Sequence, residues 1–189
     1  AGQAGTDTLR DQIAAVASTD VGDRPGDVRA AISDLGPFPA PLAMNVVPWA
    51  GSLKEDGYSS EELKVRNESR KILGLPELKV SATCVRVPVI TTHSLAVHAE
   101  FAGPVDADEA RSLLVNAPGV VVVDDPAALE FPTPADVVGT DPTYVGRIRR
   151  AVDEPNALDM FMCGDNLRKG AALNTAQIAE LLAAEFSQP

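Results

Sequence analysis

The stretch Thr83-Cys84-Val85-Arg86-Val87-Pro88-Val89-Ile90-Thr91-Thr92-His93-Ser94 joins two apolar runs, residues 78–90 and 94–102, whose β-branched content predicts neighbouring strands. Arg86 lies inside the first run, where an arginine is costly to bury without an anion. His93, one of two histidines in the chain, follows a Thr-Thr break and is placed to reach the same cleft. The pair predicts either an anion pocket with a proton-transfer group, or a buried arginine–carboxylate pair with an incidental surface histidine. Residue chemistry alone leaves both interpretations open.

Helix and strand patterns alternate along the rest of the chain. Ser59 and Glu62 have the spacing of a capping box, and Asp106 and Glu109 repeat it. Helices are predicted at residues 6–18, 27–34, 59–73, 107–115 and 171–186, and further strands at residues 42–48, 120–123, 144–150 and 157–163. This order predicts an α+β domain with a mixed, largely antiparallel sheet and helices on one face.

The composition narrows the class of protein. The chain has 189 residues, a formal net charge of −11 and 45% hydrophobic residues. The acidic balance leaves no basic stripe for nucleic acid, and no apolar stretch approaches the length of a membrane span. The chain opens on a Gly/Ala-rich segment without a methionine or a signal-peptide pattern, which we interpret as a fragment or processed chain. Cys84 and Cys163 lie in apolar runs, as expected of buried, reduced thiols in a cytoplasmic protein.

A second pair of charges belongs to the helix predicted at residues 59–73. Glu61 and Lys64 are three residues apart, so they share one helical face. Taken alone, the glutamate also fits compensation of the helix dipole, and the lysine fits an ordinary surface pair with Glu68. Together with Arg86 and His93, the set suits a substrate that carries an ammonium, a phosphate and a carboxylate.

Four motifs follow one another along the chain. They are Asn45-Val46-Val47-Pro48; Ser60-Glu61-Glu62-Leu63-Lys64 with Glu68 and Lys71-Ile72-Leu73; Thr83 to Val89 with His93-Ser94; and Gly164-Asp165-Asn166-Leu167-Arg168-Lys169-Gly170-Ala171-Ala172. In order and spacing they resemble the aspartate-β-semialdehyde dehydrogenase family. The resemblance implies a catalytic and dimerisation domain over residues 1–165, similar to the C-terminal domain of glyceraldehyde-3-phosphate dehydrogenase. Residues 166–189 would form a cofactor-side turn and a closing helix that packs on an NADP-binding domain.

The resemblance also implies a role for each matching residue. His93 corresponds to the catalytic acid/base histidine, and Arg86 to the arginine that binds the substrate α-carboxylate. Glu61 corresponds to the acidic residue near the substrate amino group, and Lys64 to the lysine that helps to hold the phosphate. Asn166 matches the turn near the nicotinamide of NADP.

The activity implied by the resemblance is the NADP-dependent interconversion of aspartate β-semialdehyde and β-aspartyl phosphate, in the biosynthesis of lysine, threonine, methionine and isoleucine. The implied protein is a cytoplasmic homodimer that binds small molecules rather than nucleic acid or membrane. The family uses a Gly-rich nucleotide loop, a nucleophilic cysteine and an active-site glutamine, and no part of these 189 residues matches them. We expect Cys84 and Cys163 to be structural, because burial disfavours the thiolate, and we expect no turnover from this chain alone.

Two alternatives remain at this point. N-acetyl-glutamyl-phosphate reductase shares the architecture and the acyl-phosphate chemistry, although Glu61 as a partner for a free amine and the spacing of Arg86 and His93 favour the semialdehyde enzyme. The other alternative is an oligomerisation module without activity of its own.

Overall fold

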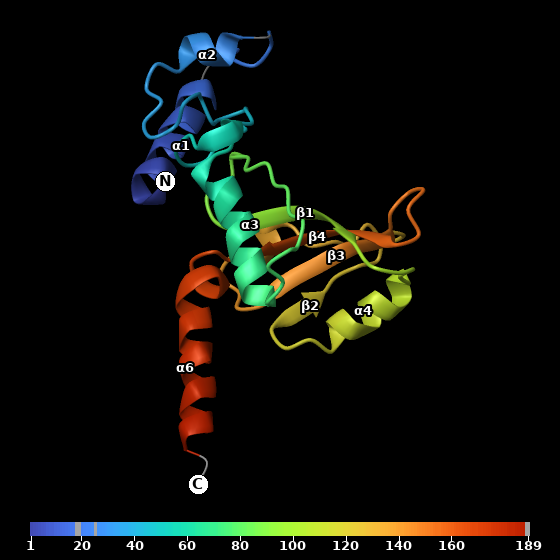
Figure 1. The fold of residues 1–189 in the computed structure, drawn as a ribbon. Coiled ribbons are helices and arrows are strands. Elements are labelled where there is room, and N and C mark those ends of the chain that lie inside the picture. Colours follow the sequence, from blue (N-terminus) through green and yellow to red (C-terminus); the bar gives the residue numbers. More distant parts are fainter. Residues whose placement is uncertain (18–19, 25, 188–189) are drawn as a thin grey trace. The chain divides into compact units, whose positions relative to one another are not determined.

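Figure 1 shows a computed structural model of the chain, in which residues 1–17, 20–24 and 26–187 are described. The chain forms two compact units, Ala1–Ile90 and Thr91–Pro189. The predicted division between residues 1–165 and 166–189 stays a prediction. No helix among the described residues is long and apolar enough to cross a membrane.

The first unit has a small apolar core next to helices α1 (Gly2–Ala17) and α2 (Asp27–Ala31). Its buried residues are Leu9, Val16, Ile32, Phe38, Leu42, Ala43 and Val47. The buried Gln12 carboxamide accepts hydrogen bonds from the N–H groups of Leu42 (2.8 Å) and Ala43 (3.2 Å) and donates to the carbonyl of Asp34 (3.0 Å). A polar group in an apolar core is tolerated because its hydrogen bonds are made.

Two helices of this unit differ from their predicted limits. α1 begins four residues earlier than predicted, and Ser18, the last residue of the predicted helix, lies outside the described residues. α2 ends at Ala31 because Ile32 adopts an extended backbone and its side chain enters the core.

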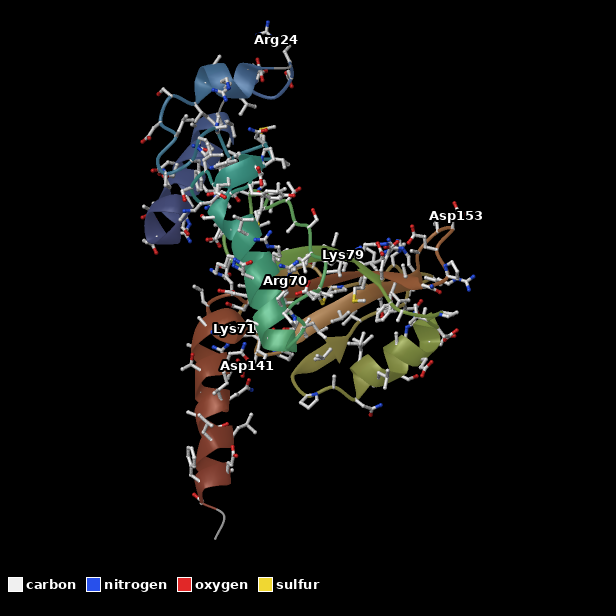
Figure 2. The ribbon with its side chains drawn as sticks, viewed as in Figure 1. Arg24, Arg70, Lys71, Lys79, Asp141 and Asp153 are labelled. Carbon is white, nitrogen blue, oxygen red and sulfur yellow. The ribbon has the colours of Figure 1, made fainter. Side chains whose placement is uncertain are left out.

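Helix α3 (Ser60–Leu73) confirms the capping-box prediction. Ser59 is fully buried and its side chain accepts from the N–H of Glu62, whose carboxylate accepts from the N–H of Ser59 at 2.8 Å. Gly74 ends the helix with a left-handed backbone, φ 66°, which glycine adopts without steric cost. Figure 2 shows Arg70 and Lys71 in the last turn, where positive charge complements the helix dipole. A short 3-10 turn, η1 (Glu55–Gly57), precedes α3.

The strands predicted at residues 42–48 and 78–90 are wrong. Among the described residues of these segments, the only β pairing is a single bridge between Val47 and Arg86, with N–H···O distances of 3.0 and 2.8 Å. Pro48 and Pro88 flank the two ends of this bridge, and neither can donate a ladder hydrogen bond. The pairing therefore stops after one residue on each side, and Val85 and Val87 remain exposed.

The second unit contains a four-stranded sheet in the order β1-β4-β3-β2. Its strands are β1 (His93–Glu100), β2 (Val120–Val122), β3 (Thr143–Arg150) and β4 (Ala157–Gly164). β4 pairs antiparallel with β1 and with β3, whereas β2 pairs parallel with β3. Helix α4 (Ala107–Val115) contacts β2 and β3, and the short α5 (Pro134–Val137) contacts β4. The predicted α+β fold with a mixed, largely antiparallel sheet is confirmed.

The side chain of Asp124 connects α4 to the part of β3 where the strand pairing shifts register. The pairing of β3 with β4 shifts register between Gly146 and Arg149. The buried carboxylate of Asp124 accepts from the N–H groups of Arg147 (2.7 Å) and Ile148 (3.2 Å) and from Nη2 of Arg111 on α4 (2.8 Å). The hydrogen bond that Arg111 donates to Asp124 raises the pKa of Arg111. A buried charge is thus matched by donors from both elements.

The second unit ends in a π-helical turn, η2 (Arg168–Ala172), and helix α6 (Leu173–Phe186). The helix begins two residues later than predicted because η2 occupies the polar turn. At the start of α4, Asp106 accepts from the N–H groups of Asp108 and Glu109, which is the N-cap half of the predicted capping box. The return bond from the Asp106 N–H to the Glu109 side chain is not formed among the described residues.

Candidate active site

Arg86 is half-buried and has no carboxylate partner in the part of the chain that the structure describes. Its backbone is fixed by the bridge to Val47, and its guanidinium lies 5.7 Å from the centre of the Phe38 ring. A cation over an aromatic face gains attraction while its N–H donors stay available. Within the described residues, the arginine–carboxylate pair that the sequence left open is therefore not formed, and the guanidinium can bind an anion.

Glu61 and Lys64 lie in the first turns of α3 and share a face, as predicted. Lys64 Nζ lies 3.5 Å from Glu61 Oε2, and the two side chains are 54% and 45% exposed. An exposed pair of this kind contributes little stability, about 0–1 kcal/mol, so both groups can turn to a ligand at low cost.

Glu62 ties this helix to the segment that carries Arg86. Its Oε1 accepts a hydrogen bond from the backbone N–H of Cys84 at 3.0 Å, while Oε2 accepts from Ser59. Both bonds lower the pKa of Glu62, and the bond from Ser59 has the larger effect. The capping-box pattern predicts the bond to Ser59. No local pattern signals the bond to Cys84, which is 22 residues away.

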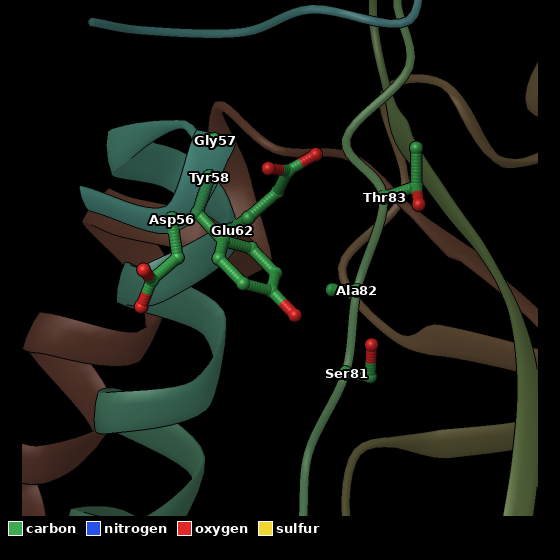
Figure 3. A pocket seen from close by; sticks show the side chains of 7 residues that line it. All are labelled: Asp56, Gly57, Tyr58, Glu62, Ser81, Ala82 and Thr83. Atoms are coloured by element: carbon green, nitrogen blue, oxygen red, sulfur yellow. The ribbon is translucent and has the colours of Figure 1, made fainter. Parts of the chain in front are cut away.

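An open cleft of ≈ 340 Å³ lies beside this connection (Figure 3). Its lining residues are Asp56, Gly57, Tyr58, Glu62, Ser81, Ala82 and Thr83. Figure 3 shows the Tyr58 ring and the Glu62 side chain between α3 and the segment at Ser81. The lining contains two carboxylates and no cationic side chain, so this cleft does not suit an anionic substrate.

In the second unit, the structure brings Asn166 next to the backbone that leads into His93. His93 is the first residue of β1, is exposed, and pairs in register with Gly164. Asn166 Oδ1 accepts a hydrogen bond from the backbone N–H of Thr92 at 2.7 Å. Thr92 has φ 100°, a conformation that costs a β-branched residue about 1–3 kcal/mol. The Thr92 hydroxyl is buried and has no hydrogen-bond partner among the described residues.

Asp165 holds the turn in which Asn166 lies. Its side chain is buried, and the carboxylate accepts from the N–H groups of Gly139 (2.8 Å), Leu167 (2.8 Å) and Arg168 (3.3 Å). These bonds, led by that from Gly139, lower the pKa of Asp165. The sequence showed only a polar turn here, and an Asp just after an apolar strand was the available signal.

The two cations after Asn166 have partners within the chain. Arg168 Nε donates to Asp141 at 2.6 Å, and Lys169 Nζ donates to the side chains of Asn174 (2.7 Å) and Gln177 (2.8 Å). Neither therefore presents a free cation in this arrangement.

Both thiols are poorly suited to act as nucleophiles. Burial is the main cause that raises the pKa of Cys84, and the negative charge of Glu62 is the second. For Cys163, burial is again the main cause of a raised pKa, and the negative charge of Asp136 is the second. A raised pKa reduces the thiolate fraction at neutral pH, which agrees with the expected structural role.

The second histidine, His98, has a separate surface environment. Its Nδ1 lies 2.8 Å from Asp159, and its Nε2 lies 3.8 Å from Glu100 and 3.7 Å from Glu154. The bond to Asp159 raises the pKa of His98. An imidazolium paired with carboxylates accounts for this cluster.

The predicted site residues thus form two groups. Glu61, Lys64 and Arg86 belong to the first unit, and His93 and Asn166 belong to the second. The first group can bind a carboxylate, an ammonium and a phosphate. The second can move a proton and offers an amide to a ligand.

The fold is that of a semialdehyde dehydrogenase domain. Residues 1–169 match the model of the family described as "Semialdehyde dehydrogenase, dimerisation domain", and the chain belongs to this family. Curated relatives of the chain include aspartate-semialdehyde dehydrogenases. That of Corynebacterium glutamicum is 51% identical over 185 residues, 96% of this chain and 52% of the relative. That of Streptomyces akiyoshiensis is 55% identical over 153 residues, 80% of this chain and 44% of the relative.

Solved structures give the same assignment. The crystal structure of aspartate semialdehyde dehydrogenase II from Vibrio cholerae, complexed with ASA, is similar with a TM-score of 0.86 at 33% identity, over 97% of this chain and 51% of that chain. The enzyme from Candida albicans with NADP is similar with a TM-score of 0.61 at 28% identity, over 76% of this chain and 46% of that chain. The chain therefore spans about half the length of the relatives it matches.

Proposed function

We propose that this chain supplies the substrate-binding and dimerisation part of an NADP-dependent enzyme that interconverts aspartate β-semialdehyde and β-aspartyl phosphate. The observation that carries the proposal is the Arg86 guanidinium, half-buried and without a carboxylate partner in the described structure, on a fold similar to the Vibrio cholerae enzyme complexed with ASA. An uncompensated arginine in a partly apolar setting is what recognition of a carboxylate requires.

The first unit binds the two ends of the substrate. Arg86 takes the α-carboxylate, because its planar fork donates two parallel hydrogen bonds and a lysine cannot. Glu61 accepts from the ammonium group, and Lys64 takes the phosphate. Their mutual pair at 3.5 Å is exposed and weak, so the substrate's own charges replace it.

The second unit supplies proton transfer. His93 is exposed at the start of β1, where its imidazole can exchange a proton with a reacting oxygen or sulfur. NADP supplies the hydride chemistry when bound. Asn166 fits a carboxamide partner, because its Nδ2 has no hydrogen-bond partner within the described residues while its Oδ1 is engaged by Thr92.

The decisive experiment is an NADP-dependent assay of the full-length gene product with aspartate β-semialdehyde and phosphate. Turnover supports the proposal. Turnover with N-acetyl-glutamate semialdehyde instead would assign the chain to the related reductase, although the carboxylate of Glu61 favours a substrate with a free ammonium. Activity with neither substrate would favour the remaining alternative, an oligomerisation module without activity of its own.

The isolated 189 residues should have no turnover, because both thiols have raised pKa values and no Gly-rich nucleotide loop is present in them. Robust oxidation of aspartate β-semialdehyde by the isolated chain would contradict this. Light scattering tests the proposed homodimer, which the dimerisation-domain family supports. The proposed pathway role is the biosynthesis of lysine, threonine, methionine and isoleucine in the cytoplasm.

A further inference from the structure

We infer that Asn166 is a positioning residue for His93, acting through the backbone of Thr92. The effect of Asn166 on catalysis rests on the proposed function, whereas its hydrogen bond with Thr92 is independent of that function. Asn166 Oδ1 and the Thr92 N–H are 2.7 Å apart, although the two residues are 74 positions apart in sequence. The bond therefore joins the turn after β4 to the residue that directly precedes His93.

Thr92 needs an external restraint to keep its conformation. Its φ of 100° is one that a β-branched residue rarely adopts, and its hydroxyl makes no compensating hydrogen bond in the described part of the chain. Relaxation of Thr92 toward the extended region would turn the start of β1 and with it the His93 side chain. The hydrogen bond that the Thr92 N–H donates to Asn166 Oδ1 opposes this relaxation.

Asn166 is itself held firmly enough to act as the restraint. Asp165, the preceding residue, is buried and accepts three backbone hydrogen bonds. Gly164, one residue earlier, is the register partner of His93 across β1 and β4. Two connections therefore link the end of β4 to the start of β1. One is the strand pairing of Gly164 with His93, and the other is the hydrogen bond between Asn166 and Thr92.

The two ends of the Asn166 carboxamide then have different tasks. Oδ1 faces an N–H donor and acts as the acceptor that fixes Thr92, which also settles the orientation of the amide. Nδ2 remains available to a ligand. Asn166→Asp keeps the acceptor and removes the donor, whereas Asn166→Ala removes both, so the two variants separate positioning from ligand contact.

The first test uses amide hydrogen exchange of the 189-residue chain, followed by NMR. In the unaltered chain the Thr92 amide should be protected, since Asn166 is its acceptor. Asn166→Ala should speed its exchange about tenfold, and Asn166→Asp should leave it near the original rate. Asn116→Ala is the matched control, because that side chain bonds to the carbonyl of Ser112 on α4. An unprotected Thr92 amide in the unaltered chain overturns the inference without any variant.

The second test uses the full-length dehydrogenase. Asn166→Ala should lower kcat about tenfold or more while the KM for aspartate β-semialdehyde stays within about twofold. Asn166→Asp keeps the acceptor for Thr92 but loses the donor to the cofactor, so it should lose less kcat than Asn166→Ala while the KM for NADP rises. An equal loss of kcat in both variants, with protection of Thr92 kept, would show that Asn166 acts only on the cofactor. A full-length protein without dehydrogenase activity refutes the proposed function, and the exchange experiment still decides the link to Thr92.

Discussion

Oε1 of Glu62 accepts a hydrogen bond from the backbone N–H of Cys84 at 3.0 Å, so the first turn of α3 is tied to the segment that carries Arg86. The same carboxylate closes the capping box with Ser59. One side chain therefore fixes both the helix that presents Glu61 and the backbone two residues before Arg86. The backbone position of Arg86, the proposed carboxylate-binding residue, therefore depends on Glu62, which has no proposed contact with the substrate.

Replacing Glu62 by Gln should destabilise the first unit, because one of its two backbone donors then faces an amide NH2 instead of an acceptor. The midpoint of thermal unfolding should fall by a few degrees, which circular dichroism measures. Glu109→Gln is the matched control, since Glu109 occupies the same N3 position in α4. Equal midpoints for the two variants would contradict this role of Glu62.

Features of the fold that depend on nearby residues could be predicted from the sequence, whereas features that depend on a distant partner could not. The limits of α3 follow from Ser59, Glu62 and Gly74, whose effects act within one helical turn. Strand formation at residues 78–90 requires a partner strand, and β-branched composition does not report whether one is present. Pro48 and Pro88 were the local signals against it.

The same distinction holds for the candidate site. Glu61 and Lys64 could be paired from their spacing alone, because i and i+3 face the same side of a helix. The bond between Asn166 and Thr92 depends on segments that only the folded chain brings together. The same is true of Arg86, which has no carboxylate partner among the residues that the structure describes.

Asp165 should make the stability of the second unit depend on pH in the acid range. Its pKa in the folded chain is lowered, so its contribution is present above the unfolded pKa, about 4, and is lost as the pH falls through the lowered value. Urea denaturation should show Asp165→Asn less stable than the unaltered chain at pH 7. The difference should narrow at about pH 3, and a difference that stays constant would contradict the assignment.

Gly146 should not tolerate a side chain. A Cβ at this position would lie 2.1 Å from the carbonyl oxygen of Val123 and 2.5 Å from Pro132. Since the first of these is backbone, Gly146→Ala should cost about 1–3 kcal/mol of unfolding free energy. Gly103→Ala is the control, because nothing lies within 4 Å of a Cβ there. Denaturant titration of both variants measures the difference.

If the proposed function holds, Arg86→Lys in the full-length protein should raise the KM for aspartate β-semialdehyde about tenfold or more. A lysine keeps the charge but loses the bidentate hydrogen bonds to a carboxylate, and the loss of one charge-assisted bond corresponds to about tenfold in affinity. Lysine also keeps attraction to the Phe38 ring, so the fold of the first unit should be unaffected. Arg10→Lys, exposed on α1, is the matched control. An unchanged KM for Arg86→Lys would remove the carboxylate role, whereas a fall in kcat alone would place Arg86 at the reacting end of the substrate.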